Sequence, residues 1–376
     1  LLMKLTLKTV LLIFLAAVVL APISFSETTF NKELDEIVGG KMQEFPKDNL
    51  FNLNQLETVG GKNKPIPFEY SLFFNYATAG PVIPALSQNY IPQGLTYLPE
   101  KNWLIGTIYA NQKNTPTVLF VIDNSSGKLI KAFNLYLDSE TIYTGHAGGV
   151  TVSARHLWIA SDAKVYRFDL DEVVGQAYNS KLIAKSIHDV ETRASFISYH
   201  EGYLWVGEFT LEKSHADYLK YPHKESHHIK SSSGNEYLAW TVGYRLEDDN
   251  FPADGHPEGI LAHINKIQGL AFSEDAIYLS QSYGRANNSY LYGFNNILKD
   301  KEDLAVNLNG KKVPLWFLEL NKKPKKVTLP PLAEGIVLAE DKLYIMFESG
   351  ADKYRTATNK YPLDRIYLLS TAIMAK

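Results

Sequence analysis

The chain contains no cysteine. This excludes disulfide bonds, a thiol nucleophile, thiolate metal sites and a lipid-modified cysteine near the N-terminus. The chain also lacks an excess of one charge sign, because 38 basic residues face 41 acidic ones and leave a net charge of -3. Nothing in this balance favours nucleic acid as a partner. The folded protein is therefore held by its core, without covalent staples.

A hydrophobic run long enough to span a membrane is also missing. The apolar run at residues 10–20 has eleven residues, short of the ~20 that a transmembrane helix needs. It follows Lys4 and Lys8 and precedes the small residues Ser24 and Ser26, which is the pattern of an export signal. We expect residues 1–26 to be a signal peptide, with Met3 as the natural start. The mature protein is then periplasmic or secreted, monomeric and without an integral membrane segment.

Common catalytic motifs are absent as well. The sequence has no phosphate-binding glycine loop, no His-Glu-x-x-His and no Gly-x-Ser-x-Gly. Function therefore has to be inferred from the fold and from the residues that the fold brings together.

The sequence does contain an internal repeat. In "TGHAGGVTVSARHLWIAS", Gly148 precedes Trp158 by ten residues. The same spacing separates four further pairs: Gln93 and Trp103, Ser195 and Trp205, Gln268 and Tyr278, Glu334 and Tyr344. The second position is glycine in every copy except that of Ser195, where it is Phe196. The third and fifth positions of each copy are apolar, and this spacing of two residues places both side chains on one face of a half-buried strand. A short polar turn before the aromatic residue makes each copy a hairpin.

The intervals between hairpins leave room for two further strands each. The copies start 55, 47, 73 and 66 residues apart. The intervals contain strand-like segments at 116–123, 128–135, 164–170, 238–246, 289–295, 313–320 and 364–370. Repeated four-stranded units predict an all-β fold, a β-propeller of five blades with six as the alternative. The last unit lacks a strand, so we expect "FEYSLFFNY" at 68–76 to close the ring. The predicted domains are an N-terminal segment at 27–66 and the propeller at 67–376.

The first strand of each propeller blade lines the central channel, so residues at its start surround the channel mouth. We expect five residues there to bind a ligand: Gln93, Arg193, Gln268, Tyr283 and Arg285. His146 and Glu208 are candidate catalytic groups, with His146 as a base. Glu334, Asp162 and Glu348 offer the hard oxygen ligands that suit Ca²⁺.

Structural explanations exist for the same residues. Polar side chains at a channel mouth are solvated without cost, and Arg285 is able to stack on Tyr283 or Tyr354. A purely structural ion pair of Glu334 with Arg193 or Lys266 is the alternative to a metal site. The insertion at 210–237 holds four histidines and suits a transition metal, although a solvated loop or lid is favoured.

The hairpin pattern resembles the superfamily of SMP-30/gluconolactonase-like and strictosidine-synthase-like propellers, over residues 93–369. The resemblance implies a divalent cation at the channel, and hydrolysis of lactones or phosphoesters. Glu334, in "AEGIV", fits the family's metal-binding glutamate. These families are mainly six-bladed, whereas five hairpins are present here. Five-bladed glycosidases are a second comparison, with Asp162, Glu208 and Glu348 as their carboxylates.

Two classes of function remain open. One is a metal-assisted hydrolase that acts at the channel mouth. The other is a non-catalytic propeller that binds a small molecule or an extracytoplasmic protein.

Overall fold

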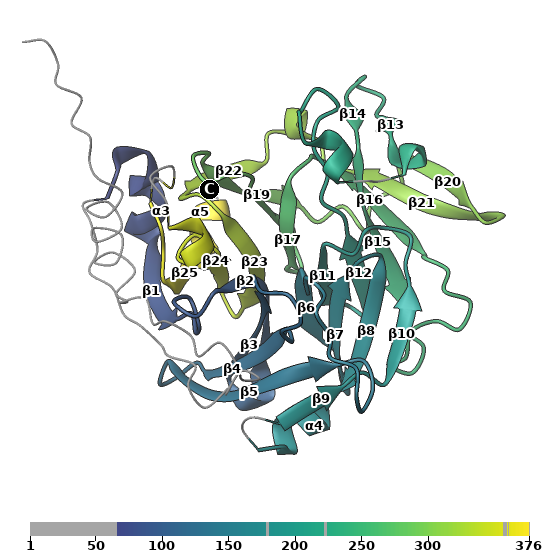
Figure 1. Cartoon of the computed structure of the whole chain (residues 1–376). Coiled ribbons are helices and arrows are strands. Elements are labelled where there is room, and N and C mark those ends of the chain that lie inside the picture. The colour runs from purple at the N-terminus through teal and green to yellow at the C-terminus, as the bar shows by residue number, and fades with distance from the viewer. Residues whose placement is uncertain (1–65, 178–179, 222–223, 356–358, 360, 376) are drawn as a thin grey trace, which may run out of the picture.

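The computed structural model describes residues 66–375, except 178–179, 222–223, 356–358 and 360. The predicted signal peptide and residues 27–65 lie outside the described residues. Five sheets surround a common axis, and the labels of their innermost strands gather at the centre of Figure 1. The fold is thus a five-bladed β-propeller. No helix within the described part of the chain is long and apolar enough to cross a membrane.

The blades are numbered in chain order, and their strands are given from the axis outward. Blade 1 contains β2 (Tyr90–Leu98), β3 (Trp103–Ala110), β4 (Val118–Asp123), β5 (Lys128–Tyr136) and β9 (Ser180–Ile183). Blade 2 contains β6 (Gly149–Val152), β7 (His156–Ser161), β8 (Lys164–Asp169) and β10 (Ser186–Asp189). Blade 3 contains β11 (Phe196–His200), β12 (Tyr203–Gly207), β15 (Ala239–Arg245), β16 (Gly259–His263), β21 (Lys311–Phe317) and β20 (Leu304–Leu308). Blade 4 contains β17 (Ile267–Phe272), β18 (Ala276–Gln281), β19 (Ser289–Asn295) and β22 (Lys325–Leu329). Blade 5 contains β23 (Ala333–Ala339), β24 (Lys342–Phe347), β25 (Arg365–Ser370) and β1 (Ala77–Val82).

The repeated glycine lies where the innermost strands of neighbouring blades meet. These five strands contact one another in a closed ring. A Cβ atom on Gly94 would lie 2.5 Å from the backbone nitrogen of Val150, and one on Gly335 would lie 2.6 Å from the carbonyl oxygen of Gln93. Gly149 and Gly269 approach the next strand in the same way. Only glycine allows so close an approach of two backbones.

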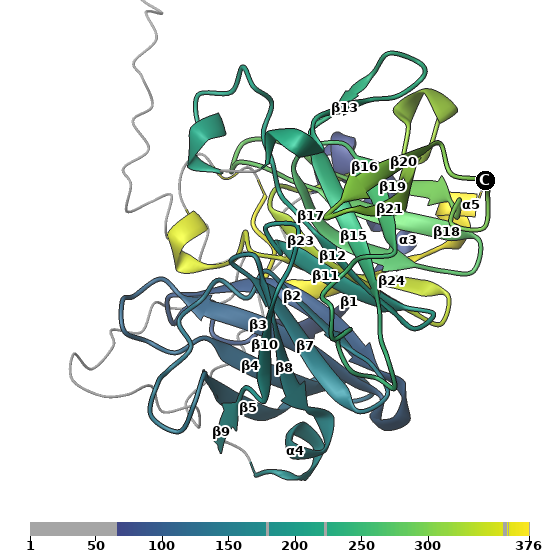
Figure 2. The same cartoon turned by 90° about the vertical axis from the view of Figure 1, so that its right-hand side faces the viewer.

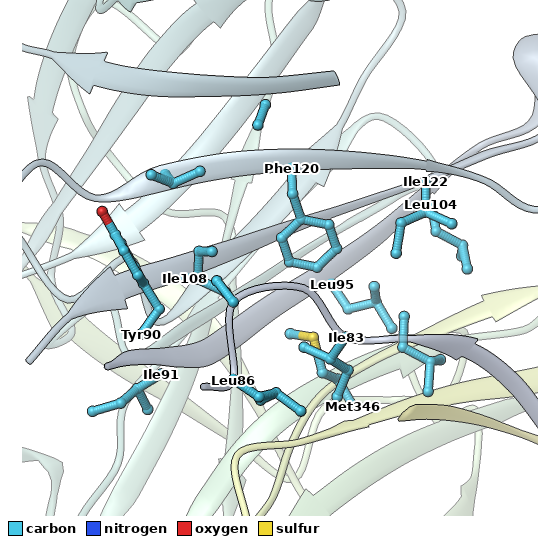
Figure 3. Packing of buried hydrophobic residues seen from close by; sticks show 14 of the residues in the cluster. Ile83, Leu86, Tyr90, Ile91, Leu95, Leu104, Ile108, Phe120, Ile122 and Met346 are labelled. Carbon is cyan, nitrogen blue, oxygen red and sulfur yellow. The ribbon is translucent and has the colours of Figure 1, made fainter. Parts of the chain in front are cut away.

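The repeated aromatic residue lies on the second strand of each blade and packs against the next blade. One such residue belongs to each of five buried apolar clusters, or packs against it: Trp103, Trp158, Trp205, Tyr278 and Tyr344. Each cluster fills one interface between two blades. In the interface of blades 5 and 1, Met346 of β24 lies beside Leu95 of β2 and Ile83 (Figure 3). Five blades and five such interfaces make a continuous ring of cores.

The predicted closing strand at 68–76 is wrong. These residues form a 3₁₀ turn η2 (Phe68–Tyr70) and a helix α3 (Ser71–Tyr76), because Tyr70 and Phe73 are buried at helical spacing while Phe68 is 93% exposed. Phe73 packs on the rings of Phe347 and Tyr367, 6.1 and 5.5 Å away. The next segment, β1, is the outermost strand of blade 5 and pairs antiparallel with β25.

The segment at 313–320 follows the fourth hairpin in the sequence, which predicts a place in blade 4, but it lies in blade 3. Its strand β21 pairs parallel with β16, so blade 3 has six strands (Figure 2). Blade 4 takes its outer strand from β22. Smaller elements complete the described chain: helices α4 (Leu170–Gly175) and α5 (Ala372–Ala375), and a ribbon of β13 (Ile229–Lys230) and β14 (Glu236–Tyr237) in the insertion.

Candidate active site at the axis of the ring

A pocket of about 440 Å³ opens at the end of the axis where the innermost strands begin. Every blade contributes the first residue of its repeat: Gln93, Gly148, Ser195, Gln268 and Glu334. All of the predicted site residues line this axial pocket, except Glu208. A second pocket contains polar side chains such as Glu100, Lys101 and Asp171, together with the apolar residues at the fifth position of the repeat: Tyr97, Val152, Tyr199, Phe272 and Leu338. The predicted site residues, except Glu208, therefore meet at the other end, in the axial pocket.

Two glutamates lie side by side in the wall of the axial pocket. Glu334 belongs to the innermost strand β23, and Glu348 follows the end of β24. Their exposed fractions are 2% and 6%. The amides of the repeat hold them in place: Gln268 Nε2 donates to Glu334 Oε1 at 3.1 Å, and Gln93 Nε2 donates to Glu348 Oε2 at 3.4 Å. The backbone N–H of Glu348 donates to the Leu332 carbonyl at 3.0 Å, which fixes the chain between them.

Burial and mutual repulsion determine the protonation of this carboxyl pair. Burial raises the pKa of Glu334 well above its ordinary value, and the charge of Glu348 adds to the effect. Burial also raises the pKa of Glu348, to about 7, although hydrogen bonds from Glu334 and Tyr354 and the charge of Lys353 oppose the shift. The pair therefore holds protons more tightly than ordinary glutamates do, shares them through the hydrogen bond between the two carboxyls and titrates as a coupled unit.

Cationic and aromatic side chains surround the carboxyl pair. Lys353 Nζ donates to the Tyr109 hydroxyl at 3.1 Å and lies 5.1 Å from the centre of the Tyr354 ring. Burial lowers the pKa of Lys353, against the opposing charge of Glu348. Arg285, the second cation near the carboxyl pair, lies over the ring of Tyr354, 5.2 Å from the ring centre. Of the two stacking contacts named for Arg285 as the alternative to ligand binding, the structure shows the one with Tyr354.

The far wall of the pocket carries His146, Asp162 and Arg193. The ring of His146 stacks on Tyr109 at 4.1 Å. Water reaches His146 from the pocket, yet protein surrounds its ring, and this desolvation together with Lys353 lowers its pKa to about 4. His146 is therefore neutral at pH 7, the form in which a histidine accepts a proton. Asp162 is exposed and accepts a hydrogen bond from Ser161 Oγ at 2.9 Å.

The insertion at 210–237 forms part of the pocket wall. The Tyr283 hydroxyl donates to Asp217 at 2.8 Å, and Arg193 lies over the ring of Tyr221 at 5.7 Å. Neither Tyr221 nor Lys353 was among the predicted site residues. Lys353 lies in "FESGADKYR", whose glycine turn and arginine mark it as unusual, whereas no pattern in the sequence singles out Tyr221.

Glu208 lies outside the axial pocket, because it anchors the insertion. Its carboxylate is 1% exposed, lies 2.6 Å from His227 Nδ1 and accepts the backbone N–H of Trp240 at 3.0 Å. The other ring nitrogen of His227 lies 3.3 Å from Glu191. Lys266, one of the two ion-pair partners considered for Glu334 as the alternative to a metal site, forms an ion pair with Glu212 at 2.9 Å.

Comparisons with known proteins give only distant similarities to solved structures. No protein-family model matches the chain, and no curated protein is similar to it in sequence. Similar solved structures include a glutaminyl cyclase from Myxococcus xanthus, at 9% identity over 78% of this chain and 97% of that one, with a TM-score of 0.40. A GH43_1 enzyme from Xanthomonas citri is 7% identical over 80% of this chain and 92% of that one, with a TM-score of 0.41. A gluconolactonase from Xanthomonas campestris is 12% identical over 78% of this chain and 95% of that one, with a TM-score of 0.32. Similarities of this size carry no conclusion about the activity of this chain.

Proposed function

We propose that the protein hydrolyses a small ester, such as a lactone, in the axial pocket, with the carboxyl pair as its acid and base. One observation carries this proposal: two buried carboxyls lie together at the wall of an open pocket, and two of the four sister repeats have glutamine at the position of Glu334. A buried like-charged pair is costly for the fold and contributes nothing to packing. Paired carboxyls with divergent pKa values are the usual means of acid–base catalysis at neutral pH.

The roles of the two carboxyls follow from their protonation. Ionised Glu348 accepts a proton from a water molecule as the water oxygen bonds to the carbonyl carbon of the ester. The charge that develops on the carbonyl oxygen is stabilised by Lys353 and Arg285 in the same wall. Protonated Glu334 gives its proton to the alcohol oxygen as the C–O bond breaks. The proton on Glu348 then returns to Glu334 through their hydrogen bond.

The residues of the pocket fit the expected Ca²⁺ poorly. Within residues 66–375, outside the gaps, no group of three or more histidine, aspartate or glutamate side chains is arranged to hold a metal ion. Lys353 and Arg285 act on the carboxyl pair electrostatically and would repel a divalent cation. The mechanism above uses no metal, and calcium binding stays a prediction that a titration of the metal-free protein tests. Export is predicted from residues 1–26, which lie outside the described residues, and it stays a prediction as well.

The alternative function is binding without catalysis, which the cations and tyrosines of the pocket favour. A panel of aliphatic lactones and aryl esters separates the two. We expect the parent to hydrolyse at least one ester, and Glu348→Gln to lower the rate by about a hundredfold or more. The matched control is Glu340→Gln, an exposed carboxylate in the turn of the same hairpin, which should leave the rate unchanged. A parent without esterase activity, or an active Glu348→Gln, contradicts the proposal.

A further inference from the structure

Three cationic side chains line the axial pocket: Arg193, Arg285 and Lys353. Burial raises the pKa of both carboxyls of the pair, which reduces the negative charge that faces these cations at neutral pH. Because a charge in a concave site is poorly screened, the three cations favour a ligand with a negative charge.

Arg193 is the group in this pocket that a ligand is best able to satisfy. Its Nη1 atom is buried and has no hydrogen-bond partner within the described residues. The guanidinium lies over the ring of Tyr221, which orders the side chain without using its N–H donors. A buried donor without a partner costs free energy that an incoming oxygen atom recovers. A planar guanidinium also matches the oxygen atoms of a carboxylate or phosphate in geometry.

Aromatic faces accompany the charge. Tyr109, Tyr221, Tyr283 and Tyr354 all line the pocket, and Phe209 packs between Tyr221 and Tyr283, with ring centres 4.9 and 5.8 Å away. His146, Arg193 and Arg285 already stack on three of these rings, so the aromatic wall is held in place, and the ring edges and the hydroxyl groups suit a cyclic molecule. We propose that the axial pocket binds a cyclic organic anion whose carboxylate or phosphate is held by Arg193. The binding part of this inference stands alone; placing an ester bond of that anion at the carboxyl pair rests on the proposed function.

The test is isothermal titration calorimetry at pH 7 with benzoate, phenyl phosphate and benzyl alcohol. The three probes share one ring and differ in the group attached to it. We expect one or both anions to bind, and the alcohol to bind at least about tenfold more weakly. The comparison of benzoate with phenyl phosphate identifies which anion the pocket prefers.

Substitutions of Arg193 test whether this side chain holds the anion. Arg193→Gln should weaken binding of the anion by about tenfold to a hundredfold, as loss of a charge-assisted hydrogen bond implies, and should leave benzyl alcohol unaffected. Arg193→Lys keeps the charge and loses the planar fork, so its affinity should fall between the two. The matched control is Arg245→Gln, because Arg245 also lies over a tyrosine ring, that of Tyr203 at 6.0 Å, but is exposed and outside the pocket.

The inference is overturned if neither anion binds, if the alcohol binds as tightly as the anions, or if Arg193→Gln binds them like the parent. Its failure is distinct from failure of the hydrolase proposal. Glu348→Gln removes a negative charge, so it should retain or tighten anion binding even where hydrolysis is lost. Anion binding without any esterase activity would refute the hydrolase and leave the anion site intact.

Discussion

At the scale of single residues, the change that matters is glutamine to glutamate at the first position of the repeat. Gln93 and Gln268 show that a neutral amide fits this position. Glu334 has nearly the same shape but brings a carboxyl next to Glu348, where burial raises the pKa of both. A protein that keeps such an arrangement gives up stability at this point, as functional sites often do.

We predict that Glu334→Gln stabilises the protein in a pH-dependent manner. Burial and the charge of Glu348 raise the folded-state pKa of Glu334 well above its ordinary value, so the stability linked to Glu334 is fully present below about pH 4.5 and is lost as the pH rises. The variant removes this loss. Its melting temperature should exceed that of the parent by about 3 °C or more at pH 8, and by less at pH 4. Glu340→Gln is the control, and a pH-independent difference would contradict the prediction.

At the scale of elements, the innermost strands depend on glycine for their close contact. We predict that Gly94→Ala destabilises the protein by about 3 kcal/mol or more, because its Cβ would lie 2.5 Å from the backbone of β6 and strands cannot retreat as a flexible side chain does. Gly175→Ala, at the end of α4, places its Cβ in open space and is the control. Urea unfolding of both variants measures the difference, and equal midpoints would refute this explanation of the repeat.

The insertion depends on one buried ion cluster. His227 is fully buried, stacks on Trp240 at 4.1 Å and lies between Glu208 and Glu191. Burial alone would lower the pKa of His227, but the hydrogen bonds to the two glutamates outweigh it and raise the pKa. The stability from this cluster is therefore present below pH about 6.5, the unfolded value, and is lost as the pH rises through the raised pKa.

We predict that His227→Ala undocks the insertion, because Glu208 is then left buried without its cationic partner, at a cost of about 3 kcal/mol or more. Limited proteolysis should cut within residues 210–237 much faster than in the parent. The parent itself should become more susceptible there at alkaline pH than at pH 6. The exposed Lys230→Ala, in the same insertion, is the control. Cleavage at the parent's rate would show that the cluster does not anchor this wall.

Sequence reasoning located most of the pocket because strand direction and repeat position are encoded locally. Once the hairpins align, residues at one position share one end of the axis, as Gln93, Gln268 and Glu334 do. Sequence reasoning failed where a partner distant in the sequence decides the structure. Glu208 contacts His227 of the insertion and so lies outside the axial pocket, and β21 pairs with β16 across a long connection. The aromatic segment at 68–76 has strand-like composition, yet its burial follows helical spacing.

At the scale of the whole molecule, blade 5 combines both ends of the described chain. The outer strand β1 pairs with β25, and the cluster around Met346 joins blade 5 to blade 1. We predict that deleting residues 68–82 lowers the free energy of unfolding by several kcal/mol, because it exposes the edge of β25 and uncovers Phe347 and Tyr367. Thermal melting measures this. A truncated protein that melts within a degree or two of the parent would show that β1 and α3 do not hold the ring.

The shared proton of the carboxyl pair is the central claim, and it is measurable without any substrate. Protein labelled with ¹³C at the glutamate carboxyl carbons gives NMR signals that Glu334→Gln and Glu348→Gln assign by their disappearance. We predict that the Glu348 signal titrates near pH 7 and that the Glu334 signal titrates well above the ordinary glutamate range. Two signals that both titrate near the ordinary glutamate value of about 4.3 would contradict it.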